Sequence, residues 1–374
     1  MAFYLEKDFF EDAELYELTE RVMSGNLTLH WFDAHTERVR CRPADPARGF
    51  TYEDCNVGSY GHESLPEFVQ RNYSMAPRGA ELWGKLPDLG YTVNRKSDVW
   101  ADNVCALYEE AKSRRWAPAV DLPWVDLGAA DTPEVVEAAM AQLCTFLQET
   151  ASAALSISSR WMHLINQEFL EVKSYLSAQI LDCARHVEVF RKRALAGGQG
   201  LKRASATAEQ ALKELLSAET YPRSAAAGQV LLGSFLLGVY RFAAAVAPTA
   251  LDARLFRLAM QDAARAVAYG TGHMRYHLAH RPDQVPALHE YLDRAEQCLA
   301  GLMGSAECLE PLIVLAGRGA GPEQARAGAR TVARGLTRLA AEYLERCEHA
   351  GLANRSGRSR LPRLLKALES AAGG

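Results

Sequence analysis

The chain has 374 residues, which is long enough to bury a large core in one big domain with appendages or in two domains. Its 42 basic and 46 acidic residues give a formal net charge of -4, so no excess of positive charge favours nucleic acid or an anionic membrane as a partner. We therefore expect no nucleic-acid partner and no membrane partner.

The eight cysteines are scattered, and no two of them form a C-x-x-C pair. Most stand in apolar helical contexts, as reduced cytosolic thiols do. The first dozen residues contain several acids and lack the basic-then-apolar order of a signal peptide. These features predict a cytoplasmic protein.

Residues 1–125 have a mixed composition. We expect a helix at 8–24, then a stretch rich in Gly, Pro, Asn and aromatic residues, and short helices around 64–71, 78–85 and 98–114. Two tryptophans and two prolines follow within 116–128, where proline would stop a helix. The sequence therefore predicts an irregular N-terminal extension over 1–125.

Residues 126–282 are expected to form the helical core. Thr132 is a candidate N-cap with Pro133 at the first helical position, and apolar residues then recur at helical spacing through Phe190, with a turn near 166–168. A third long helix is predicted from 221 to about 247. It contains the most apolar run of the chain, which Tyr240 and Arg241 interrupt, and this favours a buried helix over a membrane span. A fourth helix is predicted over 251–279.

Residues 283–374 are expected to add C-terminal helices. Two or three helices fill 284–350, with a glycine-rich loop at 317–322. The remaining tail begins basic and rich in Ser and Gly and then offers one short amphipathic helix, which predicts a partly flexible end.

Two segments of the predicted core resemble each other: LDCARHVEVF at 181–190 and QDAARAVAYG at 261–270. Each contains Asp-x-x-Arg, a spacing that permits an ion pair within one helix, between Asp182 and Arg185 and between Asp262 and Arg265. The two aspartates are 80 residues apart. The chain therefore contains a duplicated helix pair.

These segments resemble the ferritin-like diiron-carboxylate superfamily, in its branch near the ribonucleotide-reductase-like proteins and the aminobenzoate N-oxygenases. Such helices usually read Asp-Glu-x-Arg-His there, and the Glu and the His bind metal. The stretch 102–124 also looks like a segment of that branch, so the resemblance covers roughly residues 100–280. It implies an all-α, ferritin-like four-helix bundle with additional N- and C-terminal helices.

In that family, Glu and His at i and i+3 project from one helix face, and two such helices with one Glu from each remaining helix surround two irons. Carried over position by position, the second-helix pair falls on Cys183 and His186, and the fourth-helix pair falls on Ala263 and Ala266. Three of these four ligands are therefore replaced by other residues.

The two remaining ligand positions follow from the same resemblance. Glu149 is the acid at a plausible distance for the first-helix ligand, and Gly233 or Ser234 stands where the third-helix Glu is expected. The resemblance thus implies a remnant set of Glu149, Cys183 and His186 and vacated positions at Gly233, Ala263 and Ala266. Because two irons need bridging carboxylates from both halves, we expect no diiron cofactor.

Two metal sites remain open as alternatives. The remnant set Glu149, Cys183 and His186 offers three ligands for one zinc or iron ion. His273, His277 and His280 lie at i, i+4 and i+7, on one helix face. The more common structural roles are a hydrogen-bonded core histidine, a small core cysteine and a solvated helix end.

Three functions fit these observations. The leading hypothesis is a non-catalytic ferritin-like subunit or scaffold, in a homo- or hetero-oligomer with a ferritin-like homologue that keeps its diiron site and serves a biosynthesis. The first alternative is a divergent oxygenase or oxidoreductase with a mononuclear or rebuilt metal site. The second is a small-molecule binding protein whose ligand fills the vacated cavity, lined by Gly233, Phe235, Ala263 and Ala266.

Overall fold

The computed structural model describes residues 8–32, 36–82, 86–127 and 131–373. The chain divides into two compact units, one made of Met1–Lys96 and His163–Leu170 and the other of Ser97–Met162 and Glu171–Gly374. Within the described ranges the regular structure is helical, apart from two isolated bridges, Phe68 to Arg95 and Val93 to Ile165. The predicted all-α fold is confirmed for this part of the chain.

The first unit begins with helix α1 (Ala13–Met23), inside the predicted range 8–24. The Asp12 carboxylate caps this helix by accepting hydrogen bonds from the backbone N–H groups of Glu14 and Leu15. Short 3-10 turns follow between Pro46 and Ser64.

The helix predicted at 64–71 is wrong, because the backbone N–H of Val69 bonds to the carbonyl of Asn94 in an extended segment. Residues 78–82 are not helical either, and Gly79 has a φ of 79° there. The rest of the helix predicted at 78–85 lies outside the described residues.

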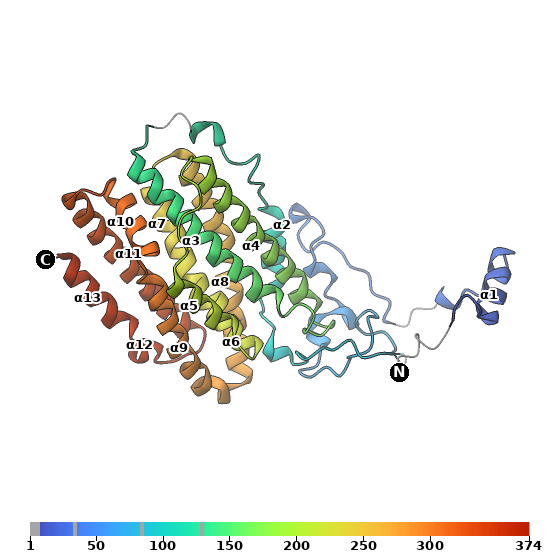
Figure 1. The fold of residues 1–374 in the computed structure, drawn as a ribbon. Helices are drawn as coiled ribbons and strands as arrows, with labels where there is room; N and C mark the ends of the chain where they lie inside the picture. Colours follow the sequence, from blue (N-terminus) through green and yellow to red (C-terminus); the bar gives the residue numbers. More distant parts are fainter. Residues whose placement is uncertain (1–7, 33–35, 83–85, 128–130, 374) are drawn as a thin grey trace. The chain divides into compact units, whose positions relative to one another are not determined.

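Four long helices form the core of the second unit. Three of them are α3 (Glu134–Ser159), α4 (Leu170–Ala196) and α8 (Ala250–His280). The other is a continuous helix made of α6 (Tyr221–Ala225), a π-helical stretch (Ala226–Leu232) and α7 (Gly233–Val246). They run side by side in Figure 1. The Gln179 amide on α4 donates a hydrogen bond to Ser158 on α3 and accepts one from Gln229 in the π-helical stretch. The predicted four-helix bundle is present.

The ends of these helices follow from local chemistry. Thr249 caps α8, since its hydroxyl accepts a hydrogen bond from the N–H of Asp252. Helix α3 starts one residue later than predicted, because Pro133 has an extended ψ of 139° and is itself the N-cap. The run Tyr221–Val246 is long and apolar enough to cross a membrane. Of its apolar 18-residue segment, 61% is buried inside the protein.

Further helices cover the bundle. Helix α2 (Val104–Ser113) packs on α8, and α5 (Ala206–Leu216) packs on α3 and α9. The C-terminal part contains α9 (Val285–Met303), α10 (Ala306–Gly317), α11 (Pro322–His349), α12 (Arg355–Arg358) and α13 (Leu361–Gly373). Helix α13 buries Leu361 and Leu365 as it packs against α11. The additional helices predicted at both ends of the core are confirmed.

Candidate functional site

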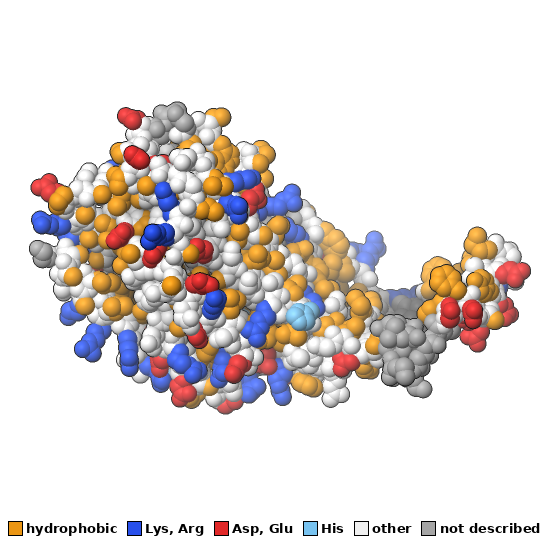
Figure 2. Space-filling view, viewed as in Figure 1, with side chains coloured by type: hydrophobic (Ala, Val, Ile, Leu, Met, Phe, Trp, Pro, Cys, Tyr) orange, Lys and Arg blue, Asp and Glu red, His pale blue; other side chains and the backbone are white. Residues whose placement is uncertain are grey.

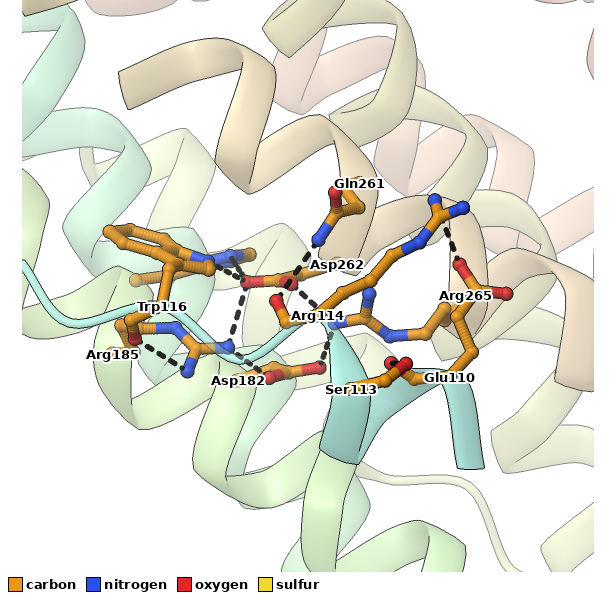
Figure 3. Close-up of polar contacts among 10 residues, drawn as sticks. Glu110, Ser113, Arg114, Trp116, Asp182, Arg185, Gln261, Asp262 and Arg265 are labelled. Carbon is orange, nitrogen blue, oxygen red and sulfur yellow. Dashed lines mark hydrogen bonds and ion pairs between the residues drawn. The ribbon is translucent and has the colours of Figure 1, made fainter. Parts of the chain in front are cut away.

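The duplicated segments face each other across α4 and α8 and join through buried charges. Asp182 and Asp262 each accept hydrogen bonds from both Arg185 and Arg265. Each arginine therefore pairs with the aspartate on its own helix and with the aspartate on the opposite helix. We call these four residues the Asp–Arg quartet (Figure 3). Both ion pairs predicted within single helices are confirmed.

The quartet has two further partners, Trp116 and His186. The Trp116 indole N–H donates to Asp262 Oδ2 at 2.8 Å, and the Arg185 guanidinium lies 4.8 Å from the indole ring. His186 Nε2 lies 3.2 Å from the same carboxylate oxygen and donates to it, because a carboxylate only accepts. Trp116 was not predicted as a site residue, since its 146-residue separation from Asp262 leaves no local pattern.

The quartet is buried and its formal charges cancel, with two carboxylates against two guanidiniums. Burial opposes ionisation of Asp262, but the hydrogen bond and charge of His186 and the charges of both arginines hold its pKa at about 2. Burial and the charge of Asp262 raise the pKa of Asp182, against the lowering influence of the arginines. The carboxylates therefore have their positive partners within the protein.

A small cavity adjoins the quartet inside the bundle, and it brings together five of the predicted positions: Cys183, His186, Gly233, Ala263 and Ala266. About 50 Å³ is open to the centres of water-sized spheres. Since one water needs roughly 10–15 Å³ by this measure, the cavity admits about three to five water-sized groups. A ligand of more than a few non-hydrogen atoms requires side chains to move.

Two residues expected at this place lie elsewhere. Glu149 is half-buried on α3, where burial and the charges of Glu209 and Glu307 raise its pKa. The α3 residues that line the cavity include Ala151 and Ala154, and at about 100° per residue Glu149 falls on another side of the helix. Phe235, predicted to line the cavity, instead packs edge-on against Phe146.

The π-helical stretch shapes one wall of the cavity. Gly228 lies in this stretch, and a Cβ added to it would come within 2.7 Å of Ile157 on α3. Tyr240, about three turns further on in α7, is fully buried, and its ring meets His186 edge-on at 5.6 Å. Its hydroxyl has no hydrogen-bond partner among the described residues. At this wall the π-helical stretch lies close to α3, and the Tyr240 hydroxyl is a buried polar group without a partner among the described residues.

Cys183 is a thiol in this setting. Burial first, and then the charges of Asp182 and Asp262, raise its pKa to about 12. A cysteine binds metal and attacks electrophiles as the thiolate, which this environment disfavours.

We therefore expect Cys183 to resist alkylation by iodoacetamide near neutral pH in the folded protein and to react after unfolding in urea. Peptide mass spectrometry measures both states. Cys41 and Cys183 are both partly exposed, and Cys41, which does not line this cavity, is the reference site that should react in the native state. Rapid native labelling of Cys183 would contradict the protonated assignment.

The three histidines near the end of α8 do not converge on one point. His273 and His277 are buried, with Nδ1 at 3.0 Å from the Trp100 carbonyl and 2.8 Å from the Ser97 carbonyl. His280 is exposed and stacks on Tyr276. Burial, followed by the neighbouring His277, lowers the pKa of His273 to about 3. Each ring has a structural hydrogen bond.

The donor set does not fit a two-iron centre. No group of three His, Cys, Asp or Glu side chains within the described ranges is placed to hold a metal ion. At the cavity, Cys183 is protonated, His186 is bonded to Asp262, and both aspartates are bonded to arginines.

Filling the cavity should stabilise the protein if it is dry. We expect Ala266→Val, which adds methyl groups next to the open space, to raise the free energy of unfolding by about 1 kcal/mol. Urea unfolding measures this change. Ala264→Val, on an exposed face of the same helix, is the matched control and should lower it by about 0.5 kcal/mol. Destabilisation by Ala266→Val would instead indicate ordered water or a rigid wall.

No protein-family model matches the chain, and no curated protein matches it. Its structure is similar to solved R2-like ligand-binding oxidases. One, with an aerobically reconstituted metal cofactor after photoconversion, is 16% identical, with a TM-score of 0.45 over 73% of this chain and 93% of the oxidase. Another, with an aerobically reconstituted Mn/Fe cofactor, is 15% identical, with a TM-score of 0.44 over 73% and 92%.

Proposed function

We propose that this protein is a non-catalytic ferritin-like bundle that acts by association, as a subunit or scaffold for a homologue that keeps a diiron site. The homologue would be of the ribonucleotide-reductase-like or aminobenzoate N-oxygenase type, and both proteins would share the cytoplasm. The observation that carries the proposal is the lining of the cavity, where Cys183, Gly233, Ala263 and Ala266 stand at positions that the resemblance implies as ligands. The buried carboxylates beside the cavity, Asp182 and Asp262, are paired with arginines.

The physical argument concerns charge. Carboxylates buried around two irons repel one another and are costly to bury without the charge of the metal. Here the positions implied as ligands by the resemblance are Cys183, Ala263 and Ala266, which place no such charge in the cavity. The bundle can therefore be stable without an ion, as a structural partner requires.

The test combines metal content with association. The protein is expressed with excess iron, purified without chelator and examined by elemental analysis, alone and after co-expression with a homologue that carries both Asp-Glu-x-Arg-His motifs. The proposal expects almost no metal on this chain and a stable complex that contains both chains. About two irons per chain, or no complex with any such homologue, would overturn it.

A second candidate function, binding of a very small neutral molecule, has one observation in its favour. The Tyr240 hydroxyl is buried at the cavity without a hydrogen-bond partner among the described residues. The volume of about 50 Å³ limits such a ligand to roughly four non-hydrogen atoms. Acetamide and ethanol are suitable probes for ligand-observed NMR. Binding that Tyr240→Phe abolishes would support this function, and binding that persists in Tyr240→Phe, or no binding, would exclude it.

A further inference from the structure

Helix α1 carries an exposed apolar face. None of its residues is buried, and Leu15, Leu18 and Val22, at i, i+3 and i+7, expose 41%, 42% and 37% of their surface. Tyr16 and Met23 widen this face and are more exposed still. Large apolar side chains gathered on one side of a surface helix mark a binding surface. Figure 2 shows hydrophobic side chains beside acidic ones on this segment.

Acidic residues border the apolar face on both sides. At about 100° per residue, Glu14 lies next to Leu18 on one border and Glu20 lies next to Tyr16 on the other. Glu17 points away from the apolar face, and Arg21, the one basic residue of the helix, lies about 20° from Glu14 and about two turns further along the same border. A matching partner needs an apolar groove with a positive charge on each wall.

The second unit contains a groove of this kind between α9 and residues 358–364. It has a volume of about 490 Å³. Ala300 on α9 and Leu361 and Leu364 on α13 supply apolar lining, and Leu364 remains 39% exposed. At 1.5 Å per residue, the α9 wall from Asp293 to Ala300 is about 10 Å long, close to the roughly 12 Å from Leu15 to Met23 on α1.

Two arginines stand on opposite walls of the groove, Arg294 on α9 and Arg360 just before α13. No ion pair within 4.0 Å joins either of them to an acid in the part of the chain that the structure describes. Arg294 also lines a neighbouring hollow that contains Glu214 and Glu219. The acids that line the groove are already paired, Asp293 with Arg355 and Arg358, and Glu296 with Arg355. The unpaired charges of the walls are therefore positive.

We propose that α1 of one copy of this chain docks into the α9–α13 groove of a second copy, so that the protein self-associates through an exchanged arm. The apolar face of α1 covers Leu364 and Ala300, and Glu14 and Glu20 each lie against one of the two arginines. This is the helix-in-groove mode, in which apolar anchors at helical spacing supply affinity and flanking charges supply orientation. It is independent of the diiron-homologue proposal.

Charge reversal tests the docking directly. Sedimentation equilibrium at low salt over a wide concentration range compares the wild type with E14R/E20R and with R294E/R360E. The wild type should self-associate, and each double variant should weaken its own association about tenfold or more. An equimolar mixture of the two variants should regain association, because the arginines of one arm then meet the glutamates of the other groove.

Two control variants each place one charge reversal of the same sign outside the proposed contact. E17R, on the outer side of α1, and R330E, on the exposed face of α11, should self-associate like the wild type. A wild type that stays monomeric at all concentrations overturns the proposal, including a monomer whose α1 cross-links to its own groove. Self-association that none of the reversals changes, or a mixture that stays monomeric, overturns it too. Metal content plays no part in these readouts, so a failure of the diiron-homologue proposal leaves them unaffected.

Discussion

Replacing Asp262 by asparagine is expected to lower the free energy of unfolding by about 3–5 kcal/mol, the usual cost of leaving a buried charge unpaired. The substitution keeps the shape of the side chain but leaves Arg185 and Arg265 facing Asp182 alone. Urea unfolding at pH 7 measures the loss. Glu188→Gln is the control. It removes an exposed ion pair with Lys192, both residues lying on α4, and should change the free energy of unfolding by less than about 1 kcal/mol.

A double-mutant cycle keeps this prediction testable if the single variant unfolds. Replacing Arg265 by glutamine in the Asp262→Asn background removes the surplus positive charge, so the double variant should be more stable than the sum of the two single losses implies. Additive losses, or a loss below about 1 kcal/mol for Asp262→Asn, would show that the quartet is solvated rather than buried.

Acid is expected to destabilise the protein through His273. This histidine has a pKa of about 3 in the folded protein against 6.5 in the unfolded chain, because burial and then His277 disfavour its charged form. Its contribution to stability is complete above pH 6.5, falls as the pH drops below 6.5 and is lost near pH 3. Between pH 7 and pH 5 we expect a loss of about 2 kcal/mol, rising to about 3–5 kcal/mol near pH 3.

Free energies of unfolding at pH 7 and pH 5 measure this dependence. His273→Phe keeps an aromatic ring beside Tyr269 but cannot take a proton, so the loss between the two pH values should shrink strongly. His280→Asn, at the exposed end of the same helix, should leave it as in the wild type. If His273→Phe shows the full loss, the response belongs to His277 or His289, whose pKa values burial also lowers.

Much of the core could be predicted because helical periodicity and Asp-x-x-Arg spacing are local properties. They predicted the long helices and both ion pairs within single helices. The contacts between helices could not be derived this way, since Trp116 and Asp262 meet across 146 residues. The choice of Glu149 shows the same limit, because a plausible distance along the chain does not specify which side of α3 a residue occupies. Local composition also failed at 64–71, where pairing with a distant segment decided the conformation.

The crossed pairing of the quartet constrains how this protein can change. Each arginine pairs with a carboxylate on its own helix and with one on the opposite helix. Replacing any one of the four residues by a neutral one therefore leaves an unpaired charge that affects both helices. The four residues therefore form one mutational unit, and an apolar replacement has to pass through a less stable intermediate sequence. The neighbouring Ala263 and Ala266 carry no such constraint. Designs that aim to give the cavity a new purpose have freedom at these positions, while the quartet acts as a fixed frame.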